Sequence, residues 1–152
     1  MDEREPHRSI DLVRTAKGRY LATNARGGEL PVGSGDDSDF TPVELLLAAI
    51  AGCSAVDVDL ITVKRSEPES FAVHCSGEKV RDARGNHLVD LRVSFDVAFP
   101  DGDDGDRARA AMPRALAQTR DRLCTVSRTV AIGEPVVFTD AGADPQAREG
   151  SS

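Results

Sequence analysis

The chain has 152 residues, a length that suits one domain large enough to bury a core. A formal net charge of -7 and a pI near 4.9 argue against nucleic acid as a partner, because no basic block offsets the acidic residues. Glu44 and Asp57 interrupt the longest apolar stretch, so no charge-free run long enough for a membrane span is predicted. The start of the chain lacks the apolar core of a secretory signal, and three cysteines match no secreted disulfide framework. We therefore expect a cytoplasmic protein.

Residues 1–9 are polar and are predicted to be disordered. Three short strands are expected next, separated by glycine-containing turns: Ile10–Thr15, Arg19–Thr23 and Glu29–Val32. An acidic loop follows and places negative charge ahead of the longest apolar stretch, where it favours the dipole of a helix.

That stretch, Thr41–Arg65, predicts a long central helix that is buried on several sides. Thr41 can cap its start, Pro42 suits the first helical position, and Glu44 completes a capping box. The helix centre, Ala48–Gly52, consists mainly of small residues. Small side chains let another backbone approach closely, so we expect a second helix here, from this chain or from a second copy.

The next two strands, Phe71–Val80 and Leu88–Phe99, predict an antiparallel hairpin. In the second strand, apolar residues alternate strictly with polar ones and should share one face: Val89, Leu91, Val93, Phe95, Val97 and Phe99. One half of the hairpin surface should therefore be buried.

A helix is expected over Asp106–Leu123, with Pro113 either kinking it or marking a restart. A last strand is expected over Val130–Phe138. Residues 141–152 form a polar tail that is predicted to be disordered. These elements predict a single α+β domain over residues 10–140.

The three cysteines have different local settings. Cys53 lies in the apolar helix, where a buried cysteine usually behaves as a small hydrophobe; a reactive thiol there would need a group from elsewhere in the fold to favour the thiolate. If a short helix begins at Cys124, its positive end lowers that thiol's pKa, and Arg128 could add to the effect or remain a solvated charge. Cys75 shares its strand face with Phe71 and Val73 and is predicted to be a core residue.

No metal or phosphate site is predicted. His74 and His87 do not combine with the cysteines in the spacing of a structural zinc site. The loop Asp101–Asp106 lacks the ligand spacing of a calcium-binding loop, and the glycines near residues 27–35 match no phosphate-binding fingerprint.

Two segments taken together, TPVELLLAAIAGCSAVDV and RDRLCTVSRTV, resemble the OsmC-like family, which includes the osmotically inducible protein and the organic hydroperoxide resistance protein. The similarity runs over residues 10–138. It implies an intertwined homodimer in which two highly curved antiparallel sheets surround paired central helices. It also implies a thiol-dependent peroxidase that needs no metal or organic cofactor.

The resemblance assigns Cys53 as the peroxidatic cysteine and Cys124 as the resolving cysteine. In that chemistry the Cys53 thiolate attacks the peroxide O–O bond and becomes a sulfenic acid. Cys124 then condenses with it to a disulfide, which an external dithiol reduces. The implied partners are an organic hydroperoxide, a dithiol reductant and a second copy of the chain.

Two features depart from the family pattern. The family's well-characterised peroxidases have a glutamate directly after the proline of the helix start, where this chain has Val43. Glu44 precedes Cys53 by nine positions, which places the two on opposite faces of one helix and about 13 Å apart along it. Glu44 is therefore expected to act as a cap, or at a site on another element or subunit.

The family arginine that supports the thiolate comes from the first strands, and three residues are candidates: Arg14, Arg19 and Arg26, with Arg19 preferred. Two other functions stay open. One is a non-catalytic dimer that binds a small apolar ligand and uses its cysteines for packing; the other is a redox sensor. Sulfurs of Cys53 and Cys124 more than about 10 Å apart on rigid elements would argue against direct pairing.

Overall fold

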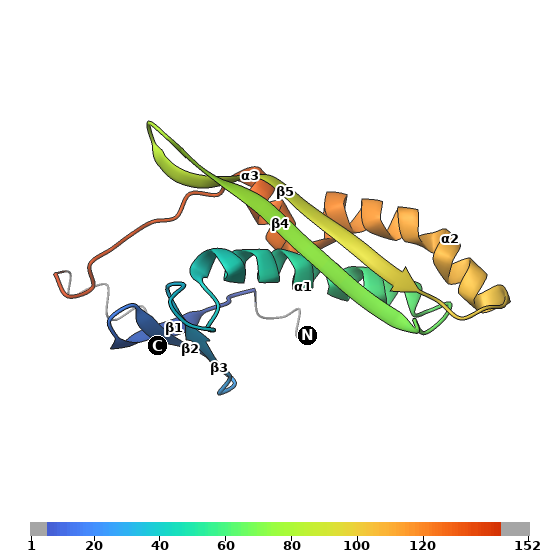
Figure 1. The fold of residues 1–152 in the computed structure, drawn as a ribbon, viewed down its shortest axis with the longest axis horizontal. Helices are drawn as coiled ribbons and strands as arrows, with labels where there is room; N and C mark the ends of the chain where they lie inside the picture. Colours follow the sequence, from blue (N-terminus) through green and yellow to red (C-terminus); the bar gives the residue numbers. More distant parts are fainter. Residues whose placement is uncertain (1–5, 144–152) are drawn as a thin grey trace.

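The computed structural model describes residues 6–143 (Figure 1). The elements in chain order are β1 (Ile10–Ala16), β2 (Arg19–Asn24), β3 (Glu29–Val32), α1 (Pro42–Thr62), β4 (Ser70–Asp82), β5 (Gly85–Ala98), α2 (Asp103–Gln118), the π-helical turn η1 (Thr119–Leu123) and α3 (Thr125–Ile132). Residues 1–5 and 144–152, which belong to the segments predicted to be disordered, lie outside the described part of the chain. In Figure 1 the β4–β5 hairpin crosses α1, and α2 runs beside the hairpin. The sheet β1–β3 lies apart from these elements, near the start of α1.

The N-terminal sheet is antiparallel in the order β1-β2-β3, which confirms the three predicted strands. Within the described residues, its only extensive contacts are among its own strands. All of β1 is exposed, including three large apolar residues: Ile10, Leu12 and Val13. A small sheet gains its stability by packing an apolar face, so this sheet lacks its cover within one chain.

Helix α1 begins as predicted. The Thr41 hydroxyl accepts a hydrogen bond from the Glu44 N–H, and the Glu44 carboxylate accepts one from the Thr41 N–H at 2.9 Å. Pro42 is the first helical residue. The helix ends at Thr62, three residues before the predicted end at Arg65.

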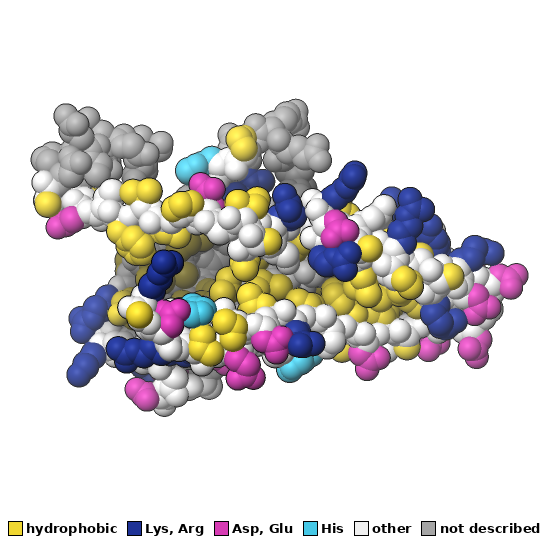
Figure 2. All heavy atoms as spheres, turned by 90° about the horizontal axis from the view of Figure 1, so that it is seen from above, with side chains coloured by type: hydrophobic (Ala, Val, Ile, Leu, Met, Phe, Trp, Pro, Cys, Tyr) yellow, Lys and Arg dark blue, Asp and Glu magenta, His cyan; other side chains and the backbone are white. Residues whose placement is uncertain are grey.

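Only one stripe of α1 is buried in the single chain: Ile50, Ser54, Val58 and Thr62, spaced four residues apart. Val56 and Leu60, by contrast, are each 59% exposed. Figure 2 shows apolar side chains gathered in the recess between two rims that carry charged side chains. The predicted burial of α1 on several sides is therefore not met within one chain. By length and hydropathy alone α1 could also cross a membrane, a criterion that the core helices of soluble proteins also meet.

The β4–β5 hairpin is confirmed, but its alternation is interrupted. The register shifts between Ser76 and Glu78, and Asp90 on the opposite strand has a positive φ of 53°. Such a bulge inserts one extra residue and reverses the faces beyond it. Val93, Phe95 and Val97 alternate as predicted, whereas Leu88 replaces Val89 as a half-buried residue near the turn. Strict alternation across the strand was a wrong prediction.

The C-terminal part differs most from expectation. Helix α2 begins at Asp103 rather than Asp106, and Pro113 lies inside it without ending it. The predicted last strand, Val130–Phe138, is wrong: its first three residues belong to α3, and no strand follows in the described chain up to residue 143. Gly133 ends α3 in the left-handed conformation that favours glycine. A short apolar run does not by itself distinguish helix from strand.

Candidate functional site

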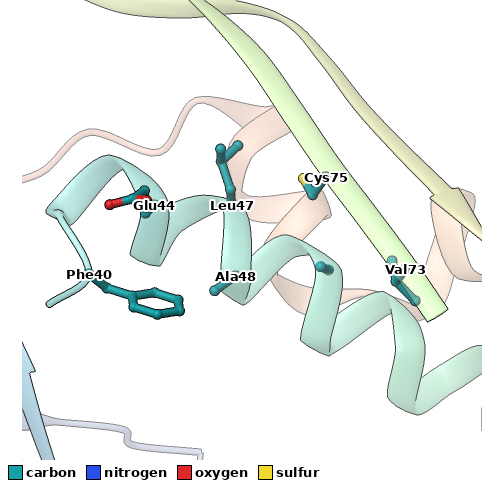
Figure 3. Close-up of a pocket in the computed structure, with 7 residues that line it drawn as sticks. Phe40, Glu44, Leu47, Ala48, Val73 and Cys75 are labelled. Carbon is teal, nitrogen blue, oxygen red and sulfur yellow. The ribbon is translucent and has the colours of Figure 1, made fainter. Parts of the chain in front are cut away.

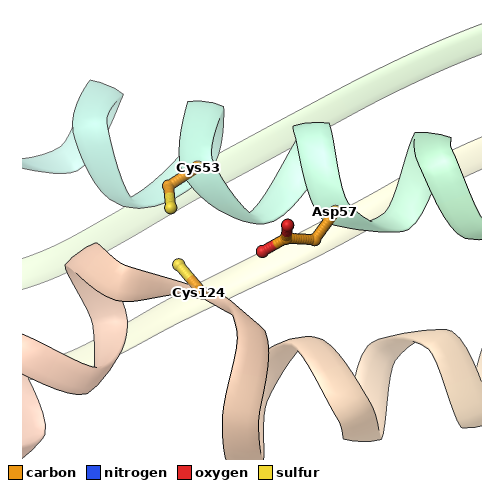
Figure 4. A group of neighbouring side chains, drawn as sticks. All are labelled: Cys53, Asp57 and Cys124. Carbon is orange, nitrogen blue, oxygen red and sulfur yellow. The ribbon is translucent and has the colours of Figure 1, made fainter. Parts of the chain in front are cut away.

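The structure brings Cys53 and Cys124 together. Their sulfurs and a carboxylate oxygen of Asp57 all lie within 4.8 Å of one another (Figure 4). Cys53 and Asp57 are one helical turn apart on the same face of α1, and Cys124 comes from the junction of η1 and α3. The sulfurs are well inside the 10 Å limit set above for direct pairing.

Cys124 is the residue that caps α3, the arrangement that the sequence analysis considered as a condition for an acidic thiol. Its sulfur accepts a hydrogen bond from the Ser127 N–H at 3.4 Å and lies 3.2 Å from the Ser127 hydroxyl. The buried Ser54 hydroxyl on α1 lies 3.5 Å from the same sulfur and 2.7 Å from the Ile50 carbonyl. Because this hydroxyl has a single proton, it can donate to the carbonyl or to the sulfur, but not to both at once. Ser54 therefore links α1 to Cys124 in either protonation state of the thiol.

These contacts give Cys124 an acidic thiol. Burial by itself acts to raise the pKa of Cys124, but its hydrogen bonds with the Ser127 hydroxyl, the Ser54 hydroxyl and the Ser127 N–H outweigh this effect, so the pKa is lowered. Cys124 has no exposed surface in the chain. The more acidic thiol of the pair is thus the one that solvent cannot reach.

Cys53 differs from Cys124 in both respects, because its pKa is raised and its side chain is partly exposed. Burial raises its pKa, the backbone N–H of Val126 partly counteracts this effect, and the neighbouring Cys124 and Asp57 raise the pKa further. Its side chain is nevertheless only partly buried. The first turn of α3 therefore directs backbone donors at both sulfurs, through Val126 to Cys53 and through Ser127 to Cys124.

Asp57 is the residue of this site that the sequence analysis missed, because it was considered only as a charge that interrupts an apolar run. Its Oδ2 atom is buried and has no hydrogen-bond partner among the described residues. Burial raises the pKa of this carboxyl group. The signal that could have found it is the spacing Cys-x-x-x-Asp, which places both side chains on one helix face. With the two thiols, Asp57 forms the cluster that could hold a metal ion.

The candidate arginines do not reach the thiols within the described chain. Arg19 forms an ion pair with Asp37 at 2.9 Å, in the loop that precedes α1. Arg128 is exposed on α3, and its charge contributes to lowering the pKa of Asp121. None of the four arginines considered is among the groups that chiefly shift the pKa of Cys53 or Cys124. For Arg128 the structure favours the solvated charge.

Glu44 lies at a different place on α1. With Leu47, Ala48 and Ala51 it lines a hollow of about 300 Å³, and Cys75 and Val73 of β4 lie on the other side (Figure 3). The capping hydrogen bond from the Thr41 N–H lowers the pKa of Glu44. Glu44 thus serves as a cap and faces away from Cys53, as the helical phase predicted. Cys75 is partly buried rather than fully in the core, and burial raises its pKa.

The chain matches the OsmC-like protein family over residues 35–139. It is 33% identical over 127 residues to the uncharacterized protein Rv2923c of Mycobacterium tuberculosis, a match that covers 82% of this chain and 90% of that protein. The chain therefore belongs to the OsmC-like family, as its two cysteine segments predicted. This family includes cysteine-based peroxidases.

Solved structures agree on the fold. An OsmC-like protein of unknown function from Vibrio cholerae has a TM-score of 0.70 at 12% identity, covering 82% of this chain and 94% of that chain. A hypothetical protein from Aquifex aeolicus has a TM-score of 0.68 at 20% identity, with 84% and 89% covered. The organic hydroperoxide resistance protein OhrB of Bacillus subtilis has a TM-score of 0.50 at 13% identity, with 80% and 90% covered. The α+β fold with antiparallel sheets and helices is thus confirmed.

Proposed function

We propose that this protein is a thiol-dependent peroxidase that reduces organic hydroperoxides in the cytoplasm. The observation that carries the proposal is the pair of free thiols, Cys53 and Cys124. The two come from segments about seventy residues apart and meet at the N-terminal end of α3, where backbone donors favour thiolates. Membership of a family that includes cysteine peroxidases supports the same conclusion.

The difference between the two thiols supports the roles that we propose for them. Cys53 is accessible, so it is the thiol that meets the peroxide, whereas Cys124 is fully buried and holds the first negative charge of the pair. The Cys124 thiolate accepts the proton of Cys53 as the Cys53 sulfur attacks the O–O bond. An S–O bond forms, the O–O bond breaks, and the alcohol leaves with that proton, which leaves a sulfenic acid on Cys53.

The second step joins the two sulfurs. The Cys124 thiolate attacks the Cys53 sulfenic acid, an S–S bond forms, and hydroxide leaves and is protonated to water. One hydroperoxide and two thiols are thereby converted to an alcohol, water and a disulfide. An external dithiol reduces the disulfide, and the cycle requires no metal or organic cofactor.

We also propose that the protein acts as a homodimer. Ala49, Gly52 and Val56 form an exposed stripe of small and apolar residues along α1, and a Cβ built on Gly52 would meet nothing within 4 Å. The apolar face of β1 is likewise uncovered in the described chain. A second copy packed against both surfaces would remove them from water, and its N-terminal sheet could supply the arginine that the thiols lack.

The decisive experiment treats the fully reduced protein with one equivalent of cumene hydroperoxide and maps its thiols by non-reducing peptide mass spectrometry. A disulfide between Cys53 and Cys124 is expected, with Cys75 still reduced. If all three thiols stay reduced, the peroxidase proposal is wrong. A redox sensor would give the same disulfide but would not consume excess hydroperoxide catalytically when a dithiol is supplied.

One observation favours a second candidate, a binding protein for small apolar molecules. The hollow between α1 and β4 is lined mostly by apolar side chains (Figure 3), and Cys53 is not one of its lining residues. In that case medium-chain fatty acids or alcohols should raise the Tm of the protein while hydroperoxide leaves its thiols unchanged.

A further inference from the structure

We propose that the reduced protein binds one divalent cation of the Zn²⁺ class between Cys53, Asp57 and Cys124. The proposal uses the thiols of the proposed peroxidase but does not depend on peroxidase activity. Two thiol sulfurs and one carboxylate oxygen lie within 4.8 Å of one another (Figure 4). Thiolate and carboxylate ligands in a tetrahedral arrangement are a set that Zn²⁺ accepts, whereas thiolates disfavour Mg²⁺ and Ca²⁺.

The geometry of the backbone fits such a site. Cys53 and Asp57 are four residues apart on α1, the spacing by which helices present two ligands to one metal ion. Cys124 is held opposite them by its capping position on α3. Two sulfurs bound to Zn²⁺ at about 2.3 Å lie roughly 3.8 Å apart, so two sulfurs within 4.8 Å of one another need to approach by about 1 Å at most.

The electrostatics of the site favour a bound cation. Asp57 Oδ2 is buried and has no hydrogen-bond partner in the described part of the chain, a condition that a bound ion would relieve. No salt bridge joins Asp57 to a lysine or arginine among the described residues. With both thiols ionised the cluster carries three negative charges, and a dication reduces this to one.

The site would be exchangeable rather than closed. Three protein ligands leave the fourth position of a tetrahedral ion open to water or to another small ligand. Cys53 and Asp57 are only partly buried, so this position can be reached from solvent. Metal binding and disulfide formation exclude each other, because both use the sulfur electrons of Cys53 and Cys124.

Oxidation should therefore release the ion. The zinc-bound dithiolate, one hydroperoxide and two protons give the disulfide, free Zn²⁺, an alcohol and water. The two electrons that break the O–O bond come from the two thiolates. Zinc should accordingly slow disulfide formation by hydroperoxide, and a chelator should restore the rate.

The test uses the reduced, chelator-treated full chain without any peroxide. Titration with Zn²⁺ against a competing chromophoric chelator should show one ion per chain, with protons released in proportion to the thiols that ionise. Titration with Cd²⁺ should produce the ultraviolet charge-transfer absorption of two thiolate ligands. Asp57→Asn should weaken Zn²⁺ binding by about 10- to 100-fold, and Cys124→Ser by about 100-fold or more. Cys75→Ser is the matched control and should bind as the unaltered protein does.

The proposal is overturned if the unaltered protein binds no more Zn²⁺ than Cys124→Ser does, or if Cys75→Ser removes binding equally. The Cd²⁺ absorption counts thiolates in the unaltered protein, so the result stands even if Asp57→Asn fails to fold. The two proposals can fail separately. Absence of metal binding leaves the hydroperoxide experiment untouched, and metal binding without a Cys53–Cys124 disulfide contradicts the peroxidase alone.

Discussion

Each side of α1 presents a carboxylate residue close to a cysteine, but the surroundings of these groups differ. On one side Cys53 and Asp57 meet Cys124 and the first N–H groups of α3, and the two thiol pKa values move in opposite directions. On the other side Glu44 is engaged in the helix cap, and Cys75 has its pKa raised by burial. A helix that is apolar almost all round becomes a candidate site only where another element brings polar donors to it.

The largest expected difference between the two sides is in turnover. Cys53→Ser should lower consumption of cumene hydroperoxide in the presence of a dithiol by about 1,000-fold or more, because the attacking sulfur is gone. Cys75→Ser, on the opposite side of the helix, should retain the rate. A colorimetric assay of remaining hydroperoxide measures both. If Cys75→Ser loses as much turnover as Cys53→Ser, then Cys53 is not the only thiol needed for the reaction and the assignment is contradicted.

Cys124→Ser should also stop turnover, but at a later step. A sulfenic acid should persist on Cys53, detectable as a dimedone adduct by mass spectrometry, since the resolving thiol is missing. Its formation should be slower by about 100-fold, because the group that accepts the Cys53 proton is lost.

The pH dependence of Cys53 oxidation tests whether Cys124 is the group that accepts the Cys53 proton. In the unaltered protein, the rate of Cys53 oxidation should rise with pH as the Cys124 thiol ionises, because the pKa of this thiol is lowered by its hydrogen bonds. In Cys124→Ser the rise should move to higher pH, because Cys53, whose pKa is raised by burial, must then ionise itself. Identical profiles in stopped-flow measurements would exclude a base role for Cys124.

A substitution in the exposed stripe of α1 tests the proposed dimer, because Gly52→Leu should stabilise an isolated chain but destabilise a dimer. In an isolated chain Gly52→Leu should stabilise the helix by up to about 1 kcal/mol, because leucine has the better helix propensity and finds open space. In a dimer packed on this stripe the same side chain blocks close approach. We expect light scattering to show a dimer for the unaltered protein and for Gly52→Ala, and a monomer for Gly52→Leu. A Gly52→Leu protein that stays dimeric would place the interface elsewhere.

The smallest effect is expected at the helix start. The pKa of Glu44 is lowered in the folded state by the Thr41 N–H, so its stabilising contribution is present above the usual glutamate pKa of about 4.3. That contribution is lost as the pH falls through the lowered value. The Tm of Glu44→Ala should therefore fall below that of the unaltered protein at pH 7, and the two should converge in acid. A Tm difference that is independent of pH would show that the charge of Glu44 is not involved.

Features set by neighbours in sequence were predictable. The capping box of Thr41 and Glu44 depends on groups three residues apart, so the residue types alone indicate it. The same holds for the three N-terminal strands, which are bounded by glycine turns. Two predictions failed where local pattern is ambiguous. The apolar run from Val130 suits helix or strand, and the bulge at Asp90 changes the phase of the alternation.

The sequence by itself determined the helix that carries Cys53, its capped start and, through resemblance, that Cys53 and Cys124 belong to one family pattern. Only the tertiary structure decided that Asp57 joins them, that Val126 and Ser127 direct N–H groups at the sulfurs, and that Glu44 lies by a separate hollow. The physical reason is distance along the chain. Hydrogen bonds within one turn are encoded by adjacent residues, whereas contacts between α1 and α3 arise from how the whole domain packs.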